Sequence, residues 1–130
     1  MVKFITIFIL LLCSIGCAPL DTQDKLDSLE IFPVVFLDDK IETALELIDH
    51  RSERLPSGHV NVMLKCISKN KKKPIWIDWK VVFSDNRNIN IEESEWHTDY
   101  LSPRLEKTLQ LSSMRRDITV FKFLIRTPVR

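Results

Sequence analysis

The chain has 130 residues, 45% of them hydrophobic and 28% charged, which fits one folded domain and excludes a disordered protein. Its formal net charge of +1 argues against a nucleic-acid binder, because such proteins need excess positive charge to displace counterions. The only glycines are Gly16 and Gly58, so a glycine-rich loop that cradles phosphate is also excluded.

Residues 1–17 have the order of an export signal. Lys3 precedes the apolar run 4–15, and the small residue Gly16 stands before Cys17. The run is shorter than the ~20 residues that a membrane-spanning helix needs. Its end, Ser14-Ile15-Gly16-Cys17, resembles the bacterial lipobox, in which the cysteine receives a diacylglyceryl group and becomes the first residue after cleavage. We therefore expect lipidation of Cys17, and an ordinary secretory signal cut near this residue is the alternative.

A lipid on Cys17 implies a place in the cell envelope. Removing residues 1–16 takes away Lys3 and no acid, so Lys plus Arg falls from 19 to 18 and equals the 18 acids. Lipid chains gain about 0.8 kcal/mol per buried CH₂, so several of them hold a protein firmly. Ala18 resembles the outer-membrane pattern, because enteric lipoproteins retained in the inner membrane have Asp after the cysteine. We expect the inner leaflet of the outer membrane, facing the periplasm.

The sequence predicts three parts: a signal peptide (1–16), a lipidated cysteine with a tether (17–40), and a β-sandwich domain (41–130). Residues 18–30 are mostly polar and lack strand-like alternation. Residues 31–37 are apolar but contain Pro33, which favours an edge strand. Residues 40–49 fit either a short helix or a first strand, and their pattern leaves both possibilities open.

Two strands with alternating apolar residues are the clearest elements. The first runs from residue 60 to 66 and the second from 75 to 83, separated by the polar turn 68–74. We expect their inward side chains to be Val60, Val62, Leu64 and Cys66 in the first strand and Ile75, Ile77, Trp79, Val81 and Phe83 in the second. Cys66 is then a small core residue.

The remainder of the chain predicts further short strands. A turn at residues 84–88 precedes a brief strand at 89–91, and residues 92–103 form a longer connection with Trp96 and Leu101 as its anchors. Strands at 108–111 and 118–125 follow. Short strands with frequent turns and almost no helix predict an all-β protein, an antiparallel β-sandwich.

The stretch from Pro74 to Asn86 resembles the YcfL-like family of predicted periplasmic lipoproteins, whose function is unknown. Shared features are an aromatic-bearing strand that ends in Asp, a following tryptophan (Trp96), a Leu-x-Pro step at residues 101–103, and Phe121-Lys122-Phe123 in the last strand. The family usually has Gly after the Asp-x pair, where this chain has Arg87-Asn88, and Asn can adopt the same left-handed geometry. The resemblance covers residues 58–126 and the lipobox, and it implies an immunoglobulin-like β-sandwich.

Two surface features are candidate binding sites. Trp76 and Val82 fall on the face of their strand opposite the expected core, and exposed apolar area of this kind commonly marks a partner contact. Coverage of Trp76 by the tether or by residues 31–48 is the alternative. The loop with Lys69, Lys71, Lys72 and Lys73 suits anionic headgroups or wall phosphates, and its alternative is a charged hairpin tip that discourages edge aggregation.

Signals for catalysis and for metal binding are weak. His50, His59 and His97 lack the spacing of zinc ligands. The acidic cluster Glu92, Glu93, Glu95 and Asp99 lacks the calcium-loop spacing, and no nucleophile motif occurs. We therefore expect no enzyme, no catalytic residues, no metal and no cofactor.

These observations favour a lipid-anchored, non-catalytic envelope lipoprotein that acts as a protein-binding or accessory module. Its expected partners are the membrane, through the N-terminal lipid, and an envelope protein. The alternative is a lipoprotein that binds anionic cell wall, lipid or a small ligand through the loop of residues 69–73.

Overall fold

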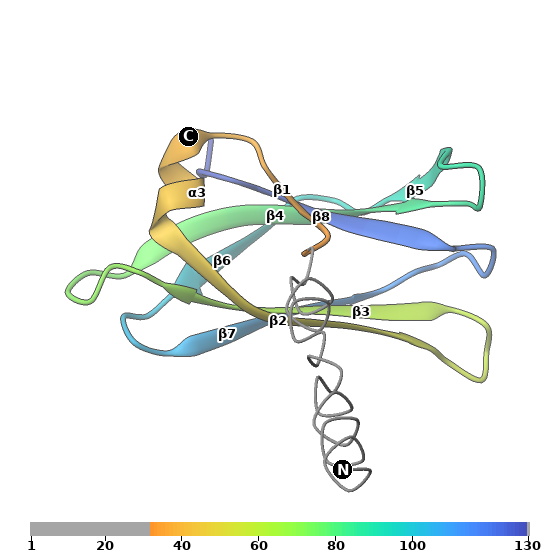
Figure 1. Ribbon diagram of the computed structural model, residues 1–130, viewed down its shortest axis with the longest axis horizontal. Helices are drawn as coiled ribbons and strands as arrows, with labels where there is room; N and C mark the ends of the chain where they lie inside the picture. Colours follow the sequence, from red (N-terminus) through yellow and green to blue (C-terminus); the bar gives the residue numbers. More distant parts are fainter. Residues whose placement is uncertain (1–31, 130) are drawn as a thin grey trace, which may run out of the picture. The chain divides into compact units, whose positions relative to one another are not determined.

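Residues 32–129, the part of the chain that the computed structural model describes, form two β-sheets packed face to face with one short helix (Figure 1). In chain order the elements are β1 (Val34–Phe36), α3 (Asp39–Ala44), β2 (Leu45–Arg54), β3 (Val60–Ser68), β4 (Ile75–Ser84), β5 (Asn90–Glu93), β6 (His97–Leu101), β7 (Glu106–Ser112) and β8 (Val120–Arg126). The prediction of an all-β sandwich is confirmed.

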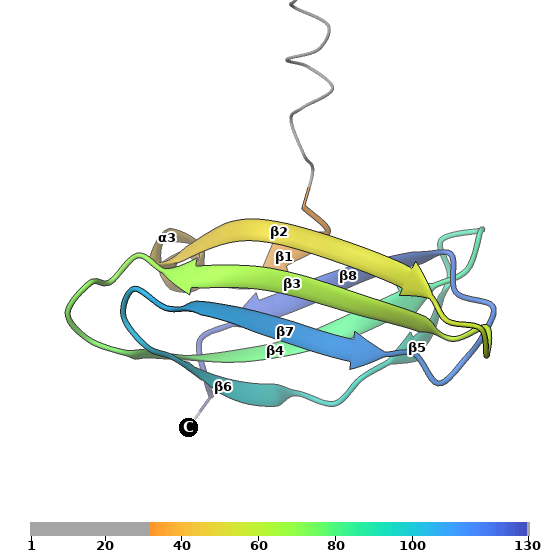
Figure 2. The same ribbon diagram turned by 90° about the horizontal axis from the view of Figure 1, so that it is seen from below.

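The five-stranded sheet has the order β1-β8-β4, with β5 and β6 both paired to the far side of β4. The three-stranded sheet has the order β2-β3-β7. Figure 2 shows the two layers one behind the other, with β3 and β7 in front of β4 and β8. Every pair is antiparallel except β1 with β8, which is parallel. On that side the central strand β4 pairs with β6 from Ile75 to Trp79 and with β5 from Val82 to Ser84.

The core lies between the inner faces of the two sheets. The inward residues expected for β3 are all buried, and in β4 all are buried except Ile75, which is half-buried at the end of the strand. Phe123 and Ile125 of β8 complete this layer, and both are fully buried. The period-two pattern of the sequence is thus realised, because each sheet turns one face to the other and one to solvent.

The folded region begins earlier than the boundary at residue 41. Strand β1 lies within the range assigned to the tether, yet it pairs with β8 from Val34 to Phe36. As expected for a strand next to Pro33, it is at an edge. The ambiguous residues 40–49 are divided: the helix ends at Ala44 and strand β2 starts at Leu45, so both interpretations hold in part.

Part of one strand and the whole of another lie where the sequence has no strand pattern. Residues 49–54 of β2 are almost entirely polar, and β6 lies in the segment expected to be a connection. Both are strands because a better-defined neighbour pairs with them, β3 in one case and β4 in the other. Leu101 is nevertheless fully buried, as expected of an anchor.

The turn after β4 has the geometry that an Asn permits. Asn88 has a φ of 60°, in the left-handed region. The carboxylate of Asp85 accepts hydrogen bonds from the backbone N–H groups of Arg87 (2.8 Å) and Ile89 (3.1 Å). Asn88 thus supplies the conformation for which glycine is the usual residue.

Candidate functional site

Trp76 is the most prominent exposed aromatic residue of the five-stranded sheet. It lies near the start of β4, opposite Tyr100 of β6, and the two rings meet edge to face at 5.0 Å between centroids. Trp76 is 49% exposed and Tyr100 is 44% exposed. The pair combines large apolar rings with a polar N–H and O–H group, a combination that is common at protein contacts. The expectation that Trp76 lies outside the core agrees with this position.

Val82 does not belong to this exposed surface, which corrects the predicted face. It is on the same side of β4 as Trp76, but only 3% of it is exposed. Asp78, between them, is also buried and accepts hydrogen bonds from Thr98 (2.7 Å) and Arg126 (3.4 Å). Beyond Asp78 the outer face is therefore covered, because side chains of neighbouring strands fold over this central strand.

Trp96 shows how the outer face is covered. Its ring receives the guanidinium of Arg126 at 3.7 Å and the ammonium of Lys80 at 4.9 Å. Cation–π contacts of this kind hold long side chains flat against the sheet. Lys80 is also paired with Glu93. The predicted role of Trp96 as an anchor of its segment fits these contacts, and the exposed surface is confined to the end of β4 that carries Trp76.

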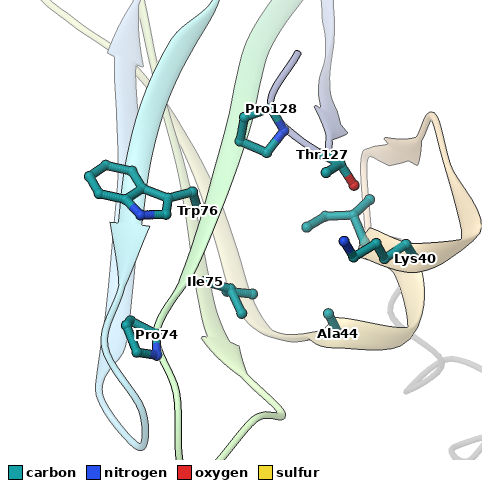
Figure 3. Close-up of a pocket in the computed structure, with 8 residues that line it drawn as sticks. Lys40, Ala44, Pro74, Ile75, Trp76, Thr127 and Pro128 are labelled. Carbon is teal, nitrogen blue, oxygen red and sulfur yellow. The ribbon is translucent and has the colours of Figure 1, made fainter. Parts of the chain in front are cut away.

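A cleft opens beside Trp76, between the start of β4, helix α3 and the residues after β8 (Figure 3). Its volume is about 450 Å³. The residues that line it are Lys40, Ile41, Ala44, Pro74, Ile75, Trp76, Thr127 and Pro128. Most are apolar, and Lys40 is the only charged one. In Figure 3 the indole of Trp76 extends over β6 on the far side of β4 from the helix, so Trp76 forms the rim of the cleft.

Asp38 holds the far wall of the cleft in place. It is the N-cap of α3, where its carboxylate accepts from the backbone N–H of Ile41 at 2.9 Å. It also accepts from the backbone N–H and the hydroxyl of Thr127, at 2.8 and 2.9 Å. These bonds, the N–H of Thr127 first and that of Ile41 second, lower the pKa of Asp38. The chain after β8 is thereby tied to the helix.

The lysine loop connects β3 of the three-stranded sheet to β4 of the five-stranded sheet, so it is not the hairpin tip that the sequence offered as an alternative. All four of its lysines are exposed. The side-chain oxygen of Asn70 accepts from the backbone N–H groups of Lys72 (3.0 Å) and Lys73 (3.1 Å), which shapes the turn. Within residues 32–129 none of Lys69, Lys71, Lys72 and Lys73 forms an ion pair. The loop is followed directly by Pro74 and Ile75, which line the cleft. Its positive charge is therefore next to the cleft in the sequence.

Several of the acidic and histidine residues make structural contacts. Glu92 accepts from the backbone N–H groups of Met114 and Arg115, and Asp99 accepts from the indole N–H of Trp79 at 2.7 Å. His97 stacks on Trp79 at 4.7 Å. Among the described residues no three His, Cys, Asp or Glu side chains are grouped so that they could hold a metal ion.

The remaining predicted site residues are the cysteines. Cys66 is fully buried, and burial, followed by the charge of Asp99, raises the pKa of its thiol to about 12. Cys17 lies outside the described residues. Within residues 32–129 no helix is both long and apolar enough to cross a membrane.

Residues in the cleft and beside it were missed from the sequence. Tyr100 was placed in a connection, and its position beside Trp76 depends on the register between β4 and β6. Lys40 was assigned to the tether. A signal for the helix did exist, because Asp38 stands three residues before the apolar Ile41 and is a preferred N-cap residue. The bond from Asp38 to Thr127 joins residues 89 positions apart and has no local signal.

Two solved structures share the fold. One is cj0090 of Campylobacter jejuni, with a TM-score of 0.62 and 10% identity, covering 75% of this chain and 100% of that one. The other is a DUF1425 family member from Shewanella sp. pv-4, with a TM-score of 0.58 and 14% identity, covering 66% of this chain and 80% of that one. No family model matches the sequence, and no curated protein matches it. At these identities the likeness establishes the fold alone, a β-rich domain similar to that of a DUF1425 protein.

Proposed function

We propose that this chain is a lipid-anchored, non-catalytic lipoprotein of the cell envelope that binds a partner protein at the Trp76 end of its five-stranded sheet. In this proposal Cys17 carries the lipid, the protein faces the periplasm from the outer membrane, and residues from Ala18 to the first strand connect anchor and domain. The domain needs no cofactor for this role.

We also propose membership of the YcfL-like family, for which DUF1425 is another name. The structural similarity to the Shewanella DUF1425 protein supports it. So does the sequence pattern from Pro74 to Asn86, with Asn88 in the left-handed geometry where the family has glycine. The buried Leu101 and the alternating Phe121-Lys122-Phe123 agree with the same pattern.

The observation that carries the binding role is the exposed pair Trp76 and Tyr100, of which Trp76 forms the rim of an apolar cleft. Large aromatic side chains contribute much of the binding energy at protein contacts, particularly beside pockets that exclude water. The remainder of the outer face near Trp76 is closed by Asp78 and Arg126, so the apolar area is local and has a defined border. A local patch with a polar border is typical of a contact site.

A comparative pull-down tests this proposal. The full-length protein, its Trp76→Ala variant and a Lys122→Ala control are each used to capture partners from detergent-solubilised envelopes. Lys122 is exposed on β8 opposite Val82, about 20 Å from Trp76 along the sheet at ~3.4 Å per residue. We expect at least one envelope protein to be lost with Trp76→Ala and retained with Lys122→Ala. Identical partner lists for all three proteins would refute the role of this surface.

The lysine loop supports a second candidate function, binding of anionic wall polymer, lipid headgroups or a small anionic ligand. Its support is the exposure of four lysines without ion pairs in the described part of the chain. Binding through exposed charges weakens as salt rises. Sedimentation with anionic vesicles and with purified wall is expected to fall between 50 and 500 mM salt and on charge removal in the loop. Salt-independent sedimentation would reject this function.

A further inference from the structure

The cleft beside Trp76 contains an unpaired position of strand β4. Pairing between β4 and β8 ends at Asp78 and Arg126. The backbone groups of Val81 point to the other side of β4. Its N–H donates to the hydroxyl of Ser94 and its C=O accepts from the backbone N–H of Ser94, both at 2.9 Å. Because the direction of backbone groups alternates along a strand, Trp76 presents its N–H and C=O toward the β8 side. Strand β8 does not pair with Trp76, and no backbone hydrogen bond joins these two groups to a described residue outside the strands.

The residues after β8 lie beside Trp76 but form no hydrogen bond with its backbone. Continued register would place Pro128 opposite Trp76, but proline has no N–H to donate. The N–H of Thr127 is already bound to Asp38 at 2.8 Å, which draws the chain toward helix α3. The two backbone groups of Trp76 on this side therefore lack a partner among the described residues, and the cleft, with Pro128 in its lining, lies beside them (Figure 3).

The charge of the cleft selects the kind of segment that fits. The floor is apolar, formed by Ile41, Ala44 and Ile75. Lys40 is the only charged residue in the lining, and Figure 3 shows its amine directed into the cleft. The exposed Lys71, Lys72 and Lys73 precede the rim residue Pro74. A ligand with one apolar side chain for the floor and a carboxylate for Lys40 complements this surface.

We propose that the cleft binds an extended segment of a partner protein, with an Asp or Glu next to an apolar side chain, by strand addition to β4 at Trp76. The inference rests on the proposed binding function and names the class of partner. Two backbone hydrogen bonds to Trp76 fix the segment, the apolar side chain enters the cleft, and the carboxylate meets Lys40. A bilayer is a poorer occupant, because a flat surface would rest on the rim and leave the floor empty.

The test is a selection of peptides against the full-length protein in detergent. The probe is a phage-displayed library of random eight-residue peptides, depleted on the Ala44→Leu protein, whose cleft is filled. Selected peptides are expected to carry Asp or Glu within two residues of Leu, Ile, Val or Phe. Enrichment of basic or neutral sequences, or no enrichment above the Ala44→Leu background, would overturn the proposal. So would Trp76-dependent binding to vesicles with anionic lipid in the absence of such peptides, which would assign the face to a membrane.

Three variants locate the selected peptides. Lys40→Glu is expected to weaken binding roughly tenfold, and Ala44→Leu, which fills the cleft, by a similar factor. Lys122→Glu is the matched control and should change binding less than twofold. An acid in the first turn of α3 favours the helix, so Lys40→Glu should fold normally, which circular dichroism checks. Equal binding by Lys40→Glu and wild type would overturn the proposed contact between a carboxylate of the bound segment and Lys40.

Hydrogen exchange of the backbone amides tests the strand addition directly. Bound peptide should slow exchange of the Trp76 amide at least tenfold and leave that of Lys122 unchanged. An unchanged Trp76 amide in the complex contradicts strand addition. The pull-down described above separates the two claims: a partner that is lost with Trp76→Ala and retained with Lys40→Glu preserves the binding function and refutes this inference.

Discussion

Trp79 of β4 contacts both of its neighbouring strands, β6 and β8, through three contacts. Its indole N–H donates to Asp99 at 2.7 Å, one face stacks on His97 at 4.7 Å, and its ring lies 5.9 Å from that of Phe123. Only 4% of it is exposed. Large aromatic residues of this kind dominate the energetics of small cores, because each buries a large apolar area.

Replacing Trp79 by Ala is therefore expected to lower the free energy of unfolding by about 3–5 kcal/mol. Urea unfolding followed by circular dichroism measures this change. Trp76→Ala is the internal comparison: its side chain is about half exposed, so its effect on stability should stay within ~0.5 kcal/mol. A loss well below 1 kcal/mol for Trp79→Ala would contradict its place in the core.

Cys66 is expected to be unreactive in the folded protein. The thiolate is the reactive form of cysteine, and a pKa of about 12 leaves almost none of it at pH 8. Peptide mapping after treatment with iodoacetamide should find Cys66 unmodified in the native protein and modified after unfolding in urea. Modification of native Cys66 at a rate close to that of the unfolded chain would contradict its burial.

The outer face of β4 shows where residue-level prediction ends. The inward residues of β3 and β4 were predicted correctly, because alternation within one strand reports which face is buried. Val82 was placed on an exposed face and is buried. Its exposure depends on which side chains of neighbouring strands lie over it, and Arg126 and Trp96 show that these can be long and distant in sequence. A single strand pattern contains no such information.

At the scale of elements, the N-cap of α3 also determines the end of β8. The carboxylate of Asp38 receives donors from Ile41 and from Thr127, so one side chain begins the helix and anchors the last described residues. Asp38→Ala is expected to cost about 1–2 kcal/mol of stability at neutral pH, the upper range for an N-cap. Urea unfolding of both proteins at pH 7 measures it.

The same carboxylate gives a defined pH dependence. The N–H groups of Thr127 and Ile41 lower the pKa of Asp38 in the folded state, so its stabilisation is fully present above the unfolded pKa of ~3.9. It is lost as the pH falls through the lowered folded value. The stability difference between wild type and Asp38→Ala should therefore shrink from pH 7 to pH 2.5. A difference that stays constant over this range would show that the charge of Asp38 contributes nothing.

Elements were predictable in proportion to their hydrophobic alternation. Strands β3 and β4 alternate over most of their length and were recognised, whereas β6 has the sequence His-Thr-Asp-Tyr-Leu and was not. β6 forms because β4 offers it backbone partners from Ile75 to Trp79. The contact between Trp76 and Tyr100 depends on this tertiary pairing, so Tyr100 could not be assigned to the exposed surface from sequence.

At the scale of the whole molecule, the proposed anchor depends on Cys17, which lies outside the described residues. Cells grown with labelled palmitate should incorporate label into the wild-type protein, and Cys17→Ser should abolish it. The variant should also remain longer, because the lipoprotein peptidase acts on the lipidated cysteine. Equal labelling of both proteins, or no labelling of either, would contradict lipid attachment at this residue.

The fold class was predictable from the chain as a whole, and the binding surface only in part. Repeated short strands separated by turns of Asn, Asp and Pro predict a β-sandwich but do not specify which strands pair. The structure has two packed sheets. The arrangement itself places β1 beside β8 and ties Thr127 to Asp38. Trp76 was identified as exposed, but the cleft arises from elements at opposite ends of the domain sequence and needs the complete topology.

Site-specific photocrosslinking in living cells tests most directly whether the Trp76 end contacts a partner. The photoreactive residue benzoylphenylalanine replaces Trp76 in one strain and Lys122 in another, and both full-length proteins are irradiated in place. We expect a discrete crosslinked envelope protein from position 76 and none from position 122. No crosslink from position 76, or the same products from both positions, would contradict a binding surface at this end of the sheet.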